Sequence, residues 1–264
     1  MTIPISHYCE KARWALERSG FAYREEPHVQ GIHRVAARRA GGGITVPVLV
    51  TPEGSIADSA EILDWVDARS APELRLFPAE REERARVKAT CRRLDDVLGP
   101  HGRRLIYVHM FGQRDAVLDC NNHGVPAWED RALRLGWPLA VRFVSRALDI
   151  RPGVEVQDEE MVWREFDHVA ELLADGRPYL CGARFGAADL TFAALAAPVL
   201  LPEHYGVRLP QPDQLAPHTA ALVQRARAHP AGRHALAMIA QRPRGDGAAG
   251  APRGAVAAAA LRSA

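Results

Sequence analysis

The chain has 264 residues, of which 47% are hydrophobic and 25% charged, and its formal net charge at pH 7 is +2. This composition is typical of a soluble globular protein that is long enough for two domains. Because 34 basic residues are balanced by 32 acidic ones, the charge gives no argument for a nucleic acid or an anionic membrane as partner.

Cysteine spacing and hydropathy exclude further classes of protein. Residues Glu10, Lys11 and Arg13 interrupt the only early apolar stretch, so no signal peptide is predicted, and no uninterrupted apolar run approaches the length of a membrane span. The cysteines show neither metal-ligand spacing nor a disulfide framework, which favours a reducing, cytoplasmic setting without a bound metal. They are Cys9, Cys91, Cys120 and Cys181.

A short apolar strand, residues 2–5, is predicted to end in Ser6. Cys9, Ala12 and Leu16 follow at helical spacing. The pattern puts a hydroxyl and a thiol where a helix points its unpaired N–H groups, and such a terminus stabilises an anion. A serine there can also donate a hydrogen bond to a thiolate. On these residues alone, Ser6 as a simple cap and Cys9 as a small buried residue remain equally open.

Two more strands and a short helix follow in the predicted N-terminal unit. Gly20 closes the first helix, and residues 21–24 form a second strand. A short basic helix and a glycine-rich loop occupy residues 31–43. The run 45–50 is β-branched and contains Pro47, which cannot donate to a ladder and therefore belongs at an edge or at a strand start.

After a turn and a short strand at Ile56, a further helix is predicted over residues 58–66. Asp58, with Glu61 three residues later, makes a start that resembles a capping box. Asp58 would cap this helix whether or not a ligand binds there.

Three motifs in this order, Ser6-x-x-Cys9, Val46-Pro47 and Asp58-Ser59, resemble the thioredoxin-like domain of the glutathione transferase superfamily, in its serine/cysteine branch. The resemblance implies a cis Pro47 that leaves the backbone of Val46 free to pair with the cysteinyl part of glutathione. It also implies that Asp58, Ser59 and the helix N-terminus hold the γ-glutamyl end, with the serine taking its carboxylate.

The rest of the chain reads as almost entirely helical. Residues 71–79 are predicted to be a linker and residues 80–98 a charged amphipathic helix. We therefore expect an α/β thioredoxin-like domain over residues 1–70 and an all-α helical bundle over 80–242, the arrangement of the superfamily. Residues 243–264 are rich in Gly, Ala, Pro and Arg and are expected to be disordered.

The segment 179–195 resembles the part of the superfamily that leads into its buried core helix. It keeps Asp189 but has Gly186 where the family has a Ser or Thr cap. Glycine is a tolerable cap, so half of the reciprocal hydrogen-bonded pair is missing. We expect a structural role for Asp189.

Residues 99–155 contain several aromatic residues between predicted helix breakers such as Pro100 and Pro138. The region is longer than the superfamily's usual helical turn. It is either an idiosyncratic packing region or a lid or wall for an apolar substrate. The sequence from Asp119 to His123 lacks a second ligand pair, so we do not predict a metal site there.

The resemblance implies a glutathione transferase, in which the thiol of the co-substrate glutathione is the reacting group. A thiol such as that of glutathione has a pKa near 8.5, and a hydrogen bond from Ser6 together with the helix N-terminus would favour the thiolate. The thiolate would then attack a small, largely apolar electrophile. Tyr8 competes for the hydroxyl role, and Cys9 is expected to be a packing residue. A homodimer is also implied.

Two alternatives stay open. In a glutathione-dependent thiol-disulfide oxidoreductase Cys9 would be the nucleophile, although Ser6 stands where the reactive cysteine of a Cys-x-x-Cys pair usually lies. In a non-catalytic scaffold the ligand residues should be lost, whereas Pro47, Asp58 and Ser59 are present. The short first strand leaves open a truncated start that weakens the site.

Overall fold

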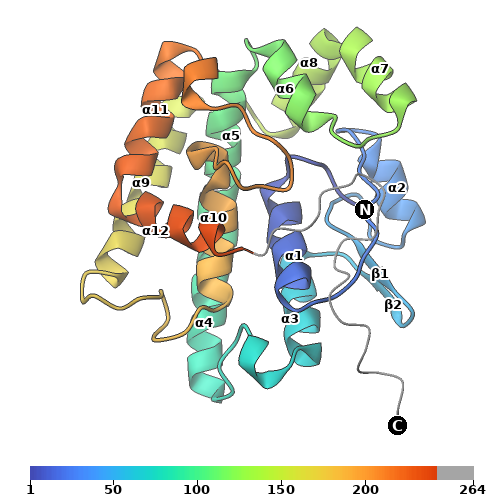
Figure 1. Ribbon diagram of the computed structural model, residues 1–264. Coiled ribbons are helices and arrows are strands. Elements are labelled where there is room, and N and C mark those ends of the chain that lie inside the picture. Colours follow the sequence, from blue (N-terminus) through green and yellow to red (C-terminus); the bar gives the residue numbers. More distant parts are fainter. Residues whose placement is uncertain (243–264) are drawn as a thin grey trace.

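The protein was analysed as a computed structural model that describes residues 1–242, so the predicted tail at 243–264 lies outside the described residues. Two parts are visible in Figure 1: a small α/β unit at the N-terminus and a larger helical part beside it. This arrangement confirms the expected thioredoxin-like domain followed by an all-helical domain. The α/β unit contains α1 (His7–Arg18), α2 (His33–Arg39), β1 (Leu49–Thr51), β2 (Gly54–Ile56) and α3 (Ser59–Arg69).

The helical part begins with α4 (Arg81–Arg93), which continues through a π turn (Leu94–Leu98) into α5 (Gly99–Met110). Helix α10 runs through its centre and packs against α1, α4, α5 and α12. None of the helices in the described part of the chain is long and apolar enough to cross a membrane. The remaining helices are α6 (Arg114–Asn121), α7 (Ala127–Leu135), α8 (Trp137–Ala147), α9 (Val154–Leu172), α10 (Ala187–Leu200), α11 (Pro217–Ala228) and α12 (Pro230–Ala240).

The sheet is smaller than predicted. Only β1 and β2 form a regular antiparallel pair, in which Leu49 lies opposite Ile56. The sheet continues through two pairs of hydrogen bonds. Val48 donates to the carbonyl of Met1 (3.1 Å) and accepts from its N-terminal amine (2.8 Å), while Thr2 donates to the carbonyl of Glu26 (3.1 Å) and accepts from His28 (2.9 Å). The backbone order is therefore residues 26–28, residues 1–2, Val48 leading into β1, and β2.

The prediction of strands over residues 2–5 and 21–24 was wrong. Thr2 forms an isolated parallel bridge with Pro27, and neither predicted range is a regular strand. Pro4 has no N–H to donate, and its carbonyl accepts a hydrogen bond from the Arg13 guanidinium at 2.7 Å. The backbone after Thr2 is thus held by a side chain on α1 instead of by a neighbouring strand.

The helix predicted over residues 80–98 runs on to Met110, so Pro100 does not break it. In the π turn Gly99 donates to the carbonyl of Leu94, five residues earlier. In a regular α-helix a proline ring clashes with the carbonyl four residues before it. The wider turn accommodates Pro100 at the start of α5, and single π turns of this kind often occur at functional sites.

The buried start of α10 confirms the structural role expected for Asp189. Its carboxylate accepts hydrogen bonds from the backbone N–H groups of Gly186 (3.0 Å) and Leu180 (2.9 Å). Asp189 is fully buried, and the ring of His234 lies 3.2 Å from one of its oxygens. The carboxylate therefore makes the retained half of the capping pair and also ties the preceding loop to the helix.

The region 99–155 covers the N-terminal unit. Helices α6, α7 and α8 lie beside α2 and the N-terminus in Figure 1. Glu129 of α7 is fully buried and accepts a hydrogen bond from the backbone of Val29 at 2.9 Å, while the ring of His28 lies 2.7 Å from its other oxygen. This contact fixes the extra helices to the loop before α2.

Candidate functional site

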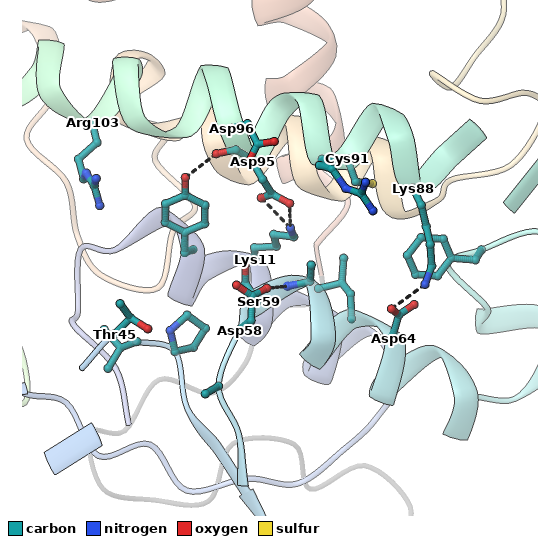
Figure 2. Close-up of a pocket in the computed structure, with 18 residues that line it drawn as sticks. Lys11, Thr45, Asp58, Ser59, Asp64, Lys88, Cys91, Asp95, Asp96 and Arg103 are labelled. Carbon is teal, nitrogen blue, oxygen red and sulfur yellow. Dashed lines mark hydrogen bonds and ion pairs between the residues drawn. The ribbon is translucent and has the colours of Figure 1, made fainter. Parts of the chain in front are cut away.

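A cavity of about 590 Å³ lies between the N-terminal unit and the long helix α4–α5; we call it the polar cavity. The end of the loop before β1 and the start of α3 form one wall, and the π turn forms the opposite wall (Figure 2). Two of the sequence-predicted binding segments meet here. The lining includes Val46, Pro47, Asp58 and Ser59.

The Val46–Pro47 peptide bond is cis, as the resemblance implied. Pro47 is buried, and Val48 immediately after it joins the sheet through Met1. Within residues 1–242 the backbone N–H and C=O of Val46 have no hydrogen-bond partner. A donor and an acceptor of the main chain are therefore available at the wall of the polar cavity.

The start of α3 supplies further hydrogen-bond donors to the same cavity. Asp58 is its N-cap, and its carboxylate accepts from the N–H of Ala60 at 2.6 Å. Ser59, the first residue of the helix, is 5% exposed and lines the cavity. Because the first N–H groups of a helix lack partners within the helix, this end favours an anion.

Opposite α3, a buried ion pair holds the π turn against α1. The ammonium of Lys11, which is 0% exposed, contacts both carboxylate oxygens of Asp95 at 2.7 and 2.8 Å. Burial raises the pKa of the Asp95 carboxyl, and the charge of Lys11 opposes that rise. Figure 2 shows the pair at the centre of the cavity.

Tyr8 lies in the same wall with its hydroxyl already engaged. The hydroxyl donates to the backbone carbonyl of Asp95 at 2.8 Å. Burial raises the pKa of the phenol, with nearby acidic groups adding to the effect. Tyr8 therefore anchors the π turn, and it is a poor competitor for thiolate stabilisation because its hydroxyl proton is already donated to this carbonyl.

A second cavity, of about 330 Å³, lies deeper between the extra helices and α10; we call it the apolar cavity. Residues on α5, α6, α8 and α10 line it. The region 99–155 therefore forms part of a cavity wall, the position that its predicted role beside an apolar substrate requires. The apolar lining includes Ile3, Ile5, Ile106, Met110, Phe143 and Val144.

Ser6 lines the apolar cavity at the start of α1. Its oxygen accepts a hydrogen bond from the N–H of Cys9 at 3.3 Å, so Ser6 is the N-cap of this helix. The hydroxyl keeps a proton that it can donate, either to the neighbouring Cys9 sulfur or to a group in the cavity. The capping role and the functional role are therefore compatible, since the first uses a lone pair and the second uses the proton.

Cys9 takes up a different position from Ser6. It is 0% exposed and lines neither cavity. Burial raises the pKa of its thiol, although Arg13 and Ser6 oppose the rise. The structure thus brings Ser6 to a cavity wall and leaves Cys9 in the core.

Arg103 and Thr45 line both cavities, so the two cavities meet where these residues lie. Figure 2 shows the Arg103 side chain extending from α5 toward Thr45. The guanidinium makes no ion pair in the described part of the chain, and its buried Nε has no hydrogen-bond partner there. A cation without a partner at this junction is suited to an anion bound between the cavities.

Sequence analysis missed Arg103. It lies in the doublet Arg103-Arg104, in which the neighbour is bound by Asp158 at 2.6 Å. The only available signal was that adjacent residues of a helix point about 100° apart, so the two arginines face different surroundings. The predicted helix end at Pro100 concealed this signal.

No group of three or more His, Cys, Asp or Glu residues within 1–242 is arranged to hold a metal ion. In the segment that starts at Asp119, Cys120 is buried and its thiol contacts the carbonyls of Ala116 and Val117 at 3.2 Å. This segment supports the wall of the apolar cavity.

A thioredoxin-like unit with a cis proline at a ligand-sized cavity, joined to a helical domain, defines the two-domain fold of glutathione transferases. The family model for the glutathione S-transferase N-terminal domain matches residues 1–74. Residues 1–74 therefore match this domain family, and the whole chain has the fold of the glutathione transferases.

Solved structures agree on the fold. A glutathione S-transferase domain-containing protein of Marinobacter aquaeolei VT8 is 21% identical, with a TM-score of 0.52 and coverage of 86% of this chain and 95% of that chain. A glutathione S-transferase of Xanthobacter autotrophicus Py2 is 18% identical, with a TM-score of 0.57 and coverage of 91% of each chain. Comparison with curated proteins gave no match. At these identities the likeness establishes the fold alone.

Proposed function

We propose that the protein is a glutathione transferase that conjugates the glutathione thiolate to a small, largely apolar electrophile. One observation carries the proposal. The polar cavity, with the backbone of Val46 and the start of α3, shares Thr45 and Arg103 with the apolar cavity, which Ser6 lines. A co-substrate in the first cavity would thus present its thiol to an electrophile in the second.

The polar cavity offers partners for the ends of glutathione. Its γ-glutamyl carboxylate would bind at Ser59 and the N–H groups that start α3, and its ammonium group would lie near Asp58. The cysteinyl backbone would pair with the free N–H and C=O of Val46. This arrangement directs the thiol toward the junction of the two cavities.

Ser6 and Arg103 would then stabilise the thiolate. The hydroxyl of Ser6 donates a hydrogen bond, and the guanidinium of Arg103 supplies a positive charge, so both favour loss of the thiol proton to solvent. Each pKa unit of lowering corresponds to about 1.4 kcal/mol. The thiolate sulfur attacks the electrophilic carbon, a C–S bond forms, and the leaving group departs with its electron pair. Positioning and electrostatics supply the catalysis.

The burial of Cys9 disfavours thiol-disulfide exchange through this residue. The reacting species in such an exchange is a thiolate, and a buried thiol with a raised pKa is seldom ionised. The scaffold alternative is disfavoured by the free main-chain groups of Val46 and by the accessible start of α3. We therefore retain the transferase.

Calorimetric titration of the full chain with glutathione tests the binding step. Wild-type protein is expected to bind glutathione, and Ser59→Ala should weaken binding by about tenfold, the loss of one hydrogen bond to a charged group. Ser55→Ala is the control, because Ser55 lies on β2 and does not line the polar cavity. Absence of heat with millimolar glutathione, or equal affinities for wild type and Ser59→Ala, would refute the assignment.

The same proposal includes assembly and setting. We propose a cytoplasmic homodimer with a role in detoxification, in which the N-terminal domain of one copy contacts the helical domain of another, as the superfamily implies. Light scattering at micromolar concentration should give the mass of two chains; the mass of one chain would contradict the dimer.

A further inference from the structure

The apolar cavity carries an uncompensated positive charge. Its lining includes Arg34 and Arg103 but no aspartate or glutamate among the described residues. The polar cavity differs, because four carboxylates line it beside four basic side chains, one of which is the shared Arg103. Two half-buried arginines with no carboxylate beside them in this wall suit an anion from outside the protein.

The other titratable groups of the apolar cavity do not cancel this charge. Burial lowers the pKa values of His7 and His33, so both rings are neutral at pH 7. Burial raises the pKa values of Tyr107 and Tyr205, and it raises that of Cys120 to about 11. These groups are also neutral at pH 7, which leaves a formal charge of +2 from the two arginines.

Arg34 belongs to the apolar cavity alone. Its guanidinium lies over the ring of Phe143, 5.1 Å from the ring centroid, so α2 and α8 are joined at the cavity wall. Arg34 makes no ion pair within residues 1–242. The aromatic ring orients the guanidinium while leaving its N–H donors unused, and these donors form the planar fork that suits a carboxylate.

We propose that the electrophilic substrate is a small apolar carboxylic acid, whose carboxylate binds Arg34 while its reactive carbon faces the thiol at the junction beside Arg103. The proposal rests on the proposed transferase function for the reaction and on the charge of the cavity for the substrate class. The apolar wall at Met110 and Val144 would hold the hydrocarbon part. A cavity of about 330 Å³ limits the substrate to roughly the size of a substituted benzoate.

Binding without glutathione tests the anion site independently of the reaction. The probes are 4-methylbenzoate and its uncharged amide, 4-methylbenzamide, titrated into the full chain by calorimetry. The carboxylate should bind about tenfold or more tightly than the amide, as a charge-assisted hydrogen-bonded pair requires. Equal affinity, or no binding of either probe, would overturn the proposal.

Substitutions at Arg34 test whether this residue binds the carboxylate. Arg34→Gln should remove the preference for 4-methylbenzoate, and Arg34→Lys should restore part of it, because it keeps the charge but loses the planar fork. Arg38→Gln is the matched control, since Arg38 lies exposed on the same helix and does not line the cavity. Circular dichroism verifies that the variants fold. An unchanged preference in Arg34→Gln, or an equal loss in Arg38→Gln, would contradict the assignment.

Conjugation provides the second readout, with 4-(bromomethyl)benzoate and its methyl ester as a matched pair. In both, the thiolate forms a C–S bond at the benzylic carbon while bromide leaves with the electron pair. The ratio of kcat/KM for the acid over the ester should exceed one in wild type and fall about tenfold in Arg34→Gln. A ratio that is the same in both proteins would refute the substrate class. Carboxylate binding without any conjugation would refute only the transferase function.

Discussion

Ser6 and Cys9 lie one helical turn apart at the start of α1, but their surroundings differ. Ser6 lines the apolar cavity with a hydroxyl proton to donate, while Cys9 is buried with a raised pKa. The fixed position of Ser6 comes partly from Arg13, whose guanidinium binds the carbonyl of Pro4 and so holds the backbone that leads to it. A single hydrogen-bond donor at the reacting sulfur is thus positioned by a buried arginine.

At this scale we predict that Ser6→Ala lowers kcat with an activated electrophile by about a hundredfold, the typical effect of one lost oxyanion-type donor. Cys9→Ala should leave turnover nearly intact and cost about 1 kcal/mol of stability or more, from the removed buried sulfur. Both variants are measured against a conjugation substrate and a mixed-disulfide substrate. Loss of activity in Cys9→Ala alone would contradict the account.

At the scale of elements, the π turn between α4 and α5 is the feature that shapes the site. It carries Asp95, which binds Lys11 from α1 and accepts the hydroxyl of Tyr8. A Cβ atom at Gly99, directly after the turn, would lie 2.2 Å from the Tyr8 hydroxyl oxygen. The absence of a side chain at Gly99 therefore lets α1 and the long helix approach closely.

Gly99→Ala should destabilise the fold by about 1–3 kcal/mol, because the Tyr8 side chain must move and its hydroxyl loses a buried partner. The same substitution should cost less in a Tyr8→Phe background. Gly102→Ala is the control on the same helix, since its Cβ would meet nothing closer than 3.7 Å. Urea unfolding is measured for the wild type, Gly99→Ala, Tyr8→Phe, the double variant and Gly102→Ala. Equal effects at Gly99 and Gly102, or no coupling to Tyr8, would show that this contact does not position the turn.

The elements also show what sequence could and could not predict. Local signals predicted three of the motifs, because a helix cap or a proline can be identified from a few neighbouring residues. These motifs are Ser6, the Val46–Pro47 pair and the Asp58–Ser59 pair. The pairing of residues 26–28 with Thr2 was missed, because the residues of two distant segments do not by themselves indicate which strands pair. The prediction that the helix ends before Pro100 was wrong, because the π turn accommodates the proline and the spacing of apolar residues does not indicate such a turn.

At the scale of the whole molecule, the site arises where two domains meet. The N-terminal domain supplies Val46 and Ser59, the helical domain supplies Arg103, and the extra helices close the apolar cavity. The position of Arg103 depends on how the long helix packs against α1, so no motif in the sequence could have predicted it. The resemblance to glutathione transferases was carried by local motifs, whereas the charge at the centre of the site required the assembled fold.

We propose that Ser6 and Arg103 hold glutathione as a thiolate when it is bound in the polar cavity. The direct test of this proposal is the ultraviolet absorbance of the thiolate as a function of pH, measured for glutathione on the protein, with S-methylglutathione as the control without a thiol. Burial raises the pKa values of Tyr8, Tyr107 and Tyr205, so these phenols stay neutral over the same pH range. We predict a pKa for the bound thiol at least about one unit below 8.5, with a return toward 8.5 in Ser6→Ala and Arg103→Gln. A bound thiol that titrates like free glutathione in the wild-type protein would contradict the account.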